Sequence, residues 1–144
     1  MTFEYRIREF QYPADYSGAL YVWESMQAGV NVGRSDSPEE IEKKLQRDPD
    51  LFLVAESNGR IIGTVIGGYD GRRGMIYHLA VLSEFRKHGV ATKLIEEVEK
   101  RLQSKGCVKS YLLVFADNAE AIQFYSARGW RHQSEDHIFG KEFP

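Results

Sequence analysis

Hydrophobic and polar positions divide the start of the chain into a short strand and a helix. Residues 3–8 (Phe-Glu-Tyr-Arg-Ile-Arg) alternate in polarity, which predicts a strand. A helical pattern then opens at Pro13, and we expect Gly29 to end it. Its apolar side chains recur every three or four residues, at Tyr16, Ala19, Leu20, Trp23 and Met26.

A second helix follows from capping chemistry. The segment Ser37-Pro38-Glu39-Glu40 has a serine at the N-cap, a proline at the first helical position and a glutamate at the third. This capping box predicts a helix that runs to about Arg47. The residues between the two helices, 29–35, are expected to form a flexible loop.

From residue 51 the period of the pattern falls to two, which is typical of strands. We expect strands over residues 51–57, 60–69 and 75–82. Asn58-Gly59 is a strong signal for a tight turn, and residues 70–74 (Asp-Gly-Arg-Arg-Gly) supply a second one. Three consecutive antiparallel strands are therefore predicted.

Helices alternate with strands in the second half of the chain. Helices are expected over residues 89–104 and 118–128. Between them, the nearly continuous apolar run 109–115 predicts a central strand covered on both faces. The tail, residues 130–143, could supply one or two short strands. The order β-α-α-β-β-β-α-β-α-β-(β) predicts a mixed α/β fold.

Length and composition narrow the class of protein. A chain of 144 residues predicts a single domain over residues 1–144. A net charge of -2 argues against a nucleic-acid-coating domain, and no apolar run approaches the ~20 residues of a membrane span. The lone Cys107 excludes an intramolecular disulfide and suits a reducing compartment. We therefore expect a cytoplasmic protein that binds neither nucleic acid nor membrane.

The segment Phe85-Arg-Lys-His-Gly-Val-Ala91 is the first candidate for chemistry, because it follows an apolar strand and opens a helix. A helix N-terminus presents unpaired N–H groups and a partial positive charge, which suits a phosphate or pyrophosphate. Gly89 would let the backbone approach such a ligand, and Arg86, Lys87 and His88 would add charge. The plainer alternative is that Gly89 only caps the helix and the basic side chains are solvated.

Two segments together resemble a known family. Leu79-Ala80-Val81 followed by Arg86-x-x-Gly89-x-Ala91 resembles the coenzyme-binding motif of the GCN5-related N-acetyltransferase superfamily, Arg/Gln-x-x-Gly-x-Gly/Ala. Asn118-Ala-Glu-Ala-Ile-Gln-Phe-Tyr125-Ser-Ala-Arg-Gly129-Trp130 resembles that family's Asn-x-x-Ala-x-x-x-Tyr-x-x-x-Gly-Phe helix. The order of elements fits the family along essentially the whole chain. Lys87, where the family often has Gly, and Ser83, where Pro is frequent, depart from the pattern.

The resemblance implies the family's α/β fold. This is a mixed, mostly antiparallel sheet of six to seven strands with about four helices, splayed between the fourth and fifth strands. It also implies acetyl-CoA as the cosubstrate. No metal is expected, because the four histidines lack metal-ligand spacing and no second cysteine supports a zinc site. The backbone of Leu79, Ala80 and Val81 would pair with the pantetheine arm, and Asn118 would hydrogen-bond to it. The loop around the pyrophosphate would consist of Arg86, Lys87, His88, Gly89, Val90, Ala91 and Thr92.

The resemblance assigns a general acid but no clear base. Tyr125 would lie near the thioester sulfur and protonate the departing thiolate. Its plainer alternative is a core tyrosine, because Ile122 shares its helical face.

The strand positions where some family members carry a base are Met75 and Tyr77 here, and neither is a base at neutral pH. Strand alternation is expected to point His78 to the opposite face. The ribosomal-protein acetyltransferases of the family place a base near Leu113, which cannot serve. We therefore expect a water chain ordered by Tyr77 and backbone carbonyls. The alternative is an acid from the first helices or their loop, Glu24 or Asp36.

The implied function is transfer of an acetyl group from acetyl-CoA to a primary amine, by direct attack in a ternary complex. The acceptor would be a small amine or an amine of a peptide or protein. The first two helices, the loop over residues 29–37 and the outer end of the fourth strand would hold it. The alternative is a catalytically reduced module of the same fold that binds and senses acyl-CoA. A homodimer is left open.

Overall fold

The computed structural model describes residues 3–26 and 30–144, and the chain divides into two compact units, residues 1–113 and 114–144. The one-domain organisation stays a prediction. The first unit contains β1 (Arg6–Glu9), α1 (Tyr16–Glu24), η1 (Arg34–Asp36), α2 (Pro38–Arg47), β2 (Phe52–Ser57), β3 (Arg60–Tyr69), β4 (Gly74–Val81), η2 (Ser83–Phe85), α3 (Val90–Ser104) and β5 (Ser110–Leu112). The second unit contains α4 (Ala119–Ser126).

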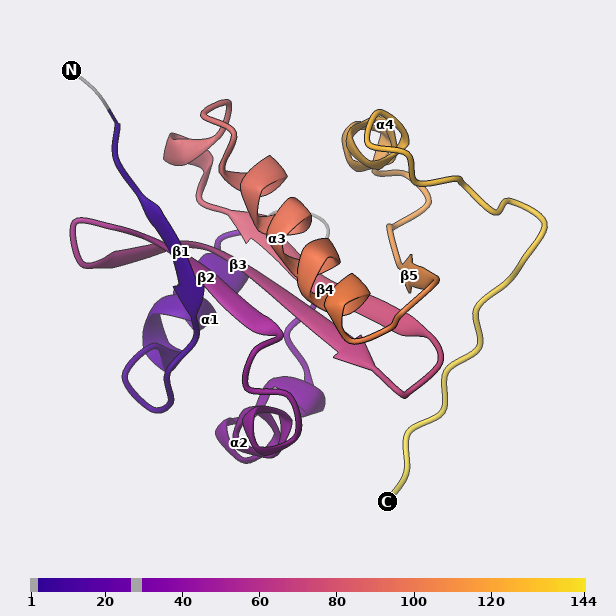
Figure 1. The fold of residues 1–144 in the computed structure, drawn as a ribbon, viewed down its shortest axis with the longest axis horizontal. Helices are drawn as coiled ribbons and strands as arrows, with labels where there is room; N and C mark the ends of the chain where they lie inside the picture. Colours follow the sequence, from indigo (N-terminus) through magenta and orange to yellow (C-terminus); the bar gives the residue numbers. More distant parts are fainter. Residues whose placement is uncertain (1–2, 27–29) are drawn as a thin grey trace. The chain divides into compact units, whose positions relative to one another are not determined.

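Five strands form one sheet in the order β1-β2-β3-β4-β5 (Figure 1). The first four strands pair antiparallel, and β5 pairs parallel with β4. That last pairing joins only residues 74–76 to residues 110–112. Because β4 continues to Val81, its second half extends beyond the last pair with β5.

Helix α3 covers one face of the sheet, and two glycines of β3 allow its close approach. A Cβ on Gly63 would lie 3.1 Å from Leu94 Cδ1, and one on Gly67 would lie 2.7 Å from Val98 Cγ2. Leu94 and Val98 themselves are fully buried. The absence of these two side chains therefore sets how closely α3 lies against β3.

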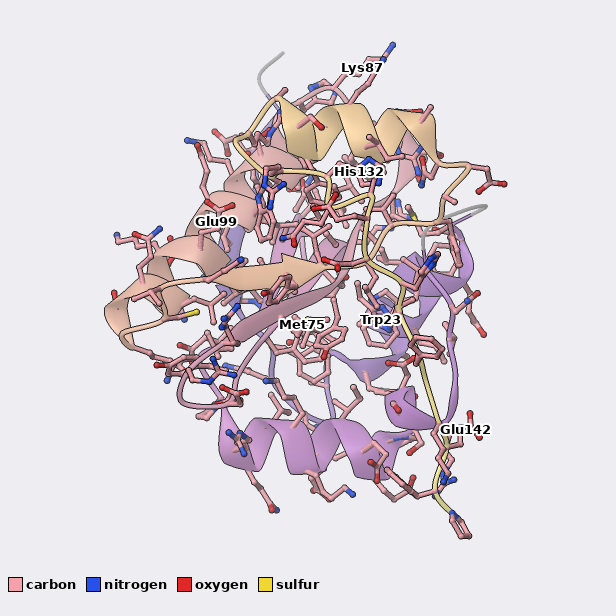
Figure 2. All side chains as sticks on the ribbon, turned by 90° about the vertical axis from the view of Figure 1, so that its right-hand side faces the viewer. Trp23, Met75, Lys87, Glu99, His132 and Glu142 are labelled. Atoms are coloured by element: carbon pink, nitrogen blue, oxygen red, sulfur yellow. The ribbon has the colours of Figure 1, made fainter. Side chains whose placement is uncertain are left out.

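Helices α1 and α2 lie on the opposite face, and Figure 2 shows the strands between α2 and α3. Trp23 of α1 is 1% exposed and donates its indole N–H to Thr64 Oγ1 of β3 at 2.9 Å. The Thr64 hydroxyl in turn donates to the carbonyl oxygen of His78 at 2.7 Å. A hydrogen-bonded chain thus joins α1, β3 and β4 inside this face.

The predicted hairpins are confirmed. Asn58 and Gly59 both have positive φ, 51° and 76°, the backbone that a tight two-residue turn needs. Strand β3 has the expected bounds, and Ser37 caps α2 by accepting the Glu40 N–H at 3.3 Å. Helix α1 begins three residues after Pro13, at Tyr16. The predicted helix end at Gly29 lies outside the described residues.

The expected six to seven strands are wrong, because residues 3–26 and 30–144 form five. Residues 113–144 are all described, and none of them forms a strand. The apolar tail residues that favoured a strand are instead exposed: Ile138 by 69%, Phe139 by 92% and Phe143 by 72%. Apolar side chains favour a strand only when a neighbouring strand supplies hydrogen bonds, and that pairing is not a local property.

The expected central strand over residues 109–115 is also corrected. Strand β5 covers only Ser110–Leu112, its residues are half-buried, and it is the last strand in the sheet order. Leu113 and Phe115, which made the run look continuous, are 57% and 43% exposed.

Candidate functional site

The N-terminus of α3 is open, as the phosphate-binding hypothesis requires. Gly89 is the N-cap residue, with φ 80°, and, having no side chain, it supplies no capping hydrogen bond. A Cβ built on Gly89 would meet no heavy atom within 4 Å, so its surroundings are empty on that side. The next residue, Val90, is buried and anchors the first turn. The helix therefore presents its first N–H groups to a space that an anion could enter.

Lys87 has the backbone of the glycine that the family pattern often places there. Its φ is 67°, in the left-handed region that costs a non-glycine residue about 1–2 kcal/mol. The side chain is exposed, and it extends outward in Figure 2. The loop thus keeps the backbone of the pattern and gains a cation, which suits a polyanionic ligand.

Arg86 and His88 flank this lysine and are held by neighbours within the first unit. The Arg86 Nε–H donates to the Val81 carbonyl at 3.4 Å, which ties the loop back to the end of β4. The His88 ring lies 5.0 Å from the Phe3 ring, centre to centre. Ala91 and Thr92, further along the predicted loop, are half-buried in the first turn of α3.

At the end of β4 the backbone is available to a ligand, whereas the side chains are largely buried. Ala80 and Val81 are 2% and 5% exposed, and Leu79 is half-buried. Residues 79–81 lie beyond the last pair with β5, so this edge of β4 has no strand beside it within the first unit. The structure therefore brings an open strand edge and the open N-terminus of α3 to the two ends of one short connection, residues 82–89.

A bulge in β4 overturns the expected direction of His78. Thr64 pairs with Ala80 but Ile66 pairs with Tyr77, so β4 carries one more residue than β3 between these pairs. His78 absorbs it with φ 51°. Its ring lies 4.8 Å from the Trp23 ring, and its Nε2 is 2.8 Å from Asp36 Oδ1. The prediction that His78 points to the face opposite Tyr77 is therefore wrong.

Tyr77 keeps the orientation that alternation predicts. Its ring is the nearest group, at 3.7 Å, to a Cβ built on Gly68, and the next is Lys44 Nζ of α2 at 3.9 Å. Tyr77 is 45% exposed, and partial burial raises the pKa of its hydroxyl. The phenol therefore stays neutral near pH 7 and can orient water but cannot accept a proton readily. Tyr77 and His78 both lie on the α1–α2 side of the sheet.

Asp36 is the residue that sequence reasoning placed only among alternatives. It lies in η1, is 8% exposed, and contacts His78 directly. Burial works against ionisation of Asp36, but hydrogen bonds from His78 and from the Gly33 N–H outweigh it, so its pKa is lowered. The other alternative, Glu24, is exposed at the end of α1. No local signal in the sequence marks the contact between Asp36 and His78.

The second unit holds the two remaining predicted residues on α4. Asn118 is the N-cap residue, and its Oδ1 accepts the Ala121 N–H at 3.1 Å. This leaves the carboxamide NH2 as the group that could donate to a ligand. Tyr125 is half-buried and lies 6.2 Å from the Trp130 ring, centre to centre. Burial raises the pKa of its hydroxyl to about 12, so Tyr125 holds its proton at neutral pH.

Among the residues that the structure describes, no three His, Cys, Asp or Glu side chains gather as a metal site. No described helix is both long and apolar enough to cross a bilayer.

The fold is a mixed sheet whose fourth strand leads, through a short connection, into a helix with a glycine at its N-cap. The family described as "Acetyltransferase (GNAT) family" matches residues 17–130. The chain belongs to the GNAT acetyltransferase family.

Several named relatives are bacterial acetyltransferases. One, from Pectobacterium atrosepticum, is 45% identical over 111 residues, which cover 77% of both chains. Another, from Sodalis glossinidius, is 38% identical over 135 residues, covering 94% of this chain and 93% of its own. Among solved structures, the PaiA N-acetyltransferase of Thermoplasma acidophilum in complex with coenzyme A has a TM-score of 0.79 at 20% identity. That match covers 92% of this chain and 93% of the other, and it shows the shared fold.

Proposed function

We propose that the protein transfers an acetyl group from acetyl-CoA to a primary amine by direct attack in a ternary complex. The observation that carries the proposal is the open N-terminus of α3, with Gly89 at φ 80° and an empty space where a Cβ would lie. The residues present fit the coenzyme, because a helix N-terminus flanked by Arg86, Lys87 and His88 suits a pyrophosphate. When bound, acetyl-CoA supplies the activated acetyl thioester.

In this proposal each element has a separate task. The N–H groups of residues 86–92 hold the pyrophosphate, and the open backbone edge at residues 79–81 pairs with the pantetheine arm. The Asn118 carboxamide donates to the same arm. Tyr125 gives its proton to the departing thiolate, and the pKa of about 12 keeps that proton in place until it is needed.

The acceptor is a small amine or an amine of a peptide or protein. We propose that it lies on the α1–α2 side of β4, where Tyr77 is exposed. Because Tyr77 is neutral, it can orient a water molecule or the acceptor without carrying charge.

Coenzyme binding is tested first by thermal unfolding with and without CoA. Coenzyme at about 100 times its Kd should stabilise the native protein by about 2.7 kcal/mol. Gly89→Glu should abolish this shift, because it adds bulk and negative charge at the helix N-terminus.

Gly59→Glu is the matched control for Gly89→Glu. Gly59 has φ 76° and, like Gly89, nothing within 4 Å of a built Cβ, but it lies in the β2–β3 turn. Its variant should bear the same backbone strain and still respond to CoA. An unchanged CoA shift in Gly89→Glu would show that the coenzyme binds elsewhere.

Catalysis is tested by free-thiol release from acetyl-CoA with a panel of small amines, peptide N-termini and lysine peptides. Amine-stimulated release supports the transferase. Tight CoA binding without stimulation by any amine would instead support the acyl-CoA-sensing module.

A further inference from the structure

The contact between His78 and Asp36 has the features of a proton-accepting pair. The His78 side chain is 15% exposed and that of Asp36 is 11% exposed, and Nε2 lies 2.8 Å from Oδ1. The other carboxylate oxygen, Oδ2, accepts the Gly33 N–H at 3.0 Å. Both oxygens of Asp36 are thus engaged, and its lowered pKa means that it remains a carboxylate at neutral pH.

The second ring nitrogen of His78 is the one left to accept a proton. With Nε2 facing the carboxylate, the neutral ring donates its proton there and carries its lone pair on Nδ1. No hydrogen bond joins Nδ1 to another group in the described part of the chain. The fully buried side-chain nitrogen or oxygen without a partner in that part is Asp50 Oδ1, so Nδ1 is not fully buried. The His78 side chain as a whole is 15% exposed.

The bulge places this nitrogen on the side of β4 where the acceptor is proposed to bind. A regular strand would have sent His78 to the α3 side, opposite Tyr77. Because the extra residue is absorbed at φ 51°, both side chains lie on the α1–α2 side. Ring contact with Trp23 at 4.8 Å fixes the plane of the imidazole.

We propose that His78 is the base that deprotonates the acceptor amine, with Asp36 as its positioning residue; this inference rests on the proposed acetyl transfer. In this step the N–H bond of the acceptor ammonium breaks and a new N–H bond forms at His78 Nδ1. The amine lone pair becomes available to the thioester carbonyl carbon. The positive charge on the ring is balanced by the Asp36 carboxylate, and the ring returns its proton to solvent before the next turnover.

The other side chains that contact His78 or Asp36 cannot act as the base. Tyr16 of α1 donates its hydroxyl to the Asp36 backbone carbonyl at 2.6 Å. Burial and then the negative charges of Asp36, Glu39 and Glu24 raise the pKa of Tyr16, so it stays neutral. On the β3 side His78 meets Thr64, which does not titrate. Tyr77, the adjacent strand residue, is a neutral phenol.

The main test is the pH dependence of kcat/KM for His78→Asn, measured by thiol release with the best amine of the panel. Asparagine tolerates left-handed backbone better than most residues, so the bulge should persist. Loss of a general base predicts a fall of about 100-fold near pH 7. The loss should shrink as the pH rises, because solvent then deprotonates a growing share of the amine. The CoA-induced thermal shift should be unchanged.

The same substitution at a second histidine, outside the proposed site, is the control for His78→Asn. His137 is exposed in the C-terminal segment, so His137→Asn should keep the wild-type rate and pH profile.

Asp36→Asn tests the positioning role with a readout that a merely structural contact would not move. The amide can still hydrogen-bond to His78 but removes the negative charge beside the ring. The pH–rate profile of Asp36→Asn should therefore differ from that of the wild type, and kcat should fall.

Three results separate the outcomes. If no amine stimulates thiol release by the wild type, the proposed function fails and this inference falls with it. If the wild type is active but His78→Asn keeps its rate and pH profile, only this inference is overturned. If Tyr77→Phe lowers the rate while His78→Asn does not, the proton leaves through water ordered by Tyr77 instead of through His78.

Discussion

The close contact between α3 and β3 predicts opposite effects for alanine at two adjacent glycines. A Cβ on Gly67 would lie 2.7 Å from Val98 Cγ2, whereas a Cβ on Gly68 would have no neighbour closer than 3.7 Å. Carbon atoms pack at about 3.5–4.0 Å, so Gly67→Ala forces α3 or Val98 to move by roughly 1 Å. Gly68→Ala requires no movement.

The expected magnitudes follow from these distances. Overpacking in a well-packed core costs about 1–3 kcal/mol, and Val98 is fully buried against the sheet. Replacing a strand glycine by alanine without strain gains about 0.5–1 kcal/mol. We therefore expect Gly67→Ala to be about 1.5–4 kcal/mol less stable than Gly68→Ala, which corresponds to roughly 5–12 °C in Tm at about 3 °C per kcal/mol.

Urea and thermal unfolding of the two variants measure the difference, and a third substitution tests its cause. Val98→Ala removes the methyl group that the added Cβ of Gly67→Ala would strike, so the double variant should be more stable than the sum of the two single effects predicts, by about 1–2 kcal/mol. Equal stabilities of Gly67→Ala and Gly68→Ala, or strict additivity with Val98→Ala, would refute this account of the packing.

Three further predictions concern the loop, the proposed acid and a buried ion pair. Lys87→Gly should raise stability by about 0.5–1 kcal/mol, because relief of the left-handed backbone outweighs the entropy of glycine; Lys100→Gly, in the interior of α3, should lose about 1 kcal/mol in the same unfolding assay. Tyr125→Phe should lower kcat at least 10-fold and leave the CoA shift intact; an unaltered rate removes Tyr125 from the chemistry. Burial opposes ionisation of Asp15, but hydrogen bonds from Arg8 and the Gln11 N–H lower its pKa below the ordinary 3.8. Its stabilising effect is therefore present above that value and lost as the pH falls through the native pKa. Asp15→Asn should cost about 2 kcal/mol at pH 7, with the gap closing in acid; a gap that persists at low pH would contradict the assignment.

Much of the first unit could be predicted because its signals are local. Asn58-Gly59 specifies a tight turn by its own backbone preferences, and Ser37 specifies a helix start by its own side chain. Strand β3 consequently has the predicted bounds, and β4 differs from its prediction by one residue at each end. The tail differs, because whether Phe139 lies in a strand depends on a partner strand and not on its apolar side chain.

The helix start beside the proposed coenzyme loop could be predicted for the same reason. Residues 86–91 are consecutive, and their chemistry depends on a helix start that the sequence pattern reveals. The positive φ of Lys87 could not be predicted from the sequence. A lysine gives no sign that its backbone is left-handed, and only the surrounding fold imposes that conformation.

The direction of His78, the proposed base, could not be predicted, because it depends on the number of residues between paired positions of two strands. One extra residue between the pairs Thr64–Ala80 and Ile66–Tyr77 reverses the side to which His78 points. The bulge is held by the chain from Trp23 through the Thr64 hydroxyl to the His78 carbonyl, and these three residues come from α1, β3 and β4. The hydrophobic pattern of residues 75–82, read without the neighbouring strand, predicts a regular strand. The hydrogen bonds that make the strand irregular are the same ones that bring His78 beside Asp36, so the catalytic inference and the departure from periodicity have a single structural cause.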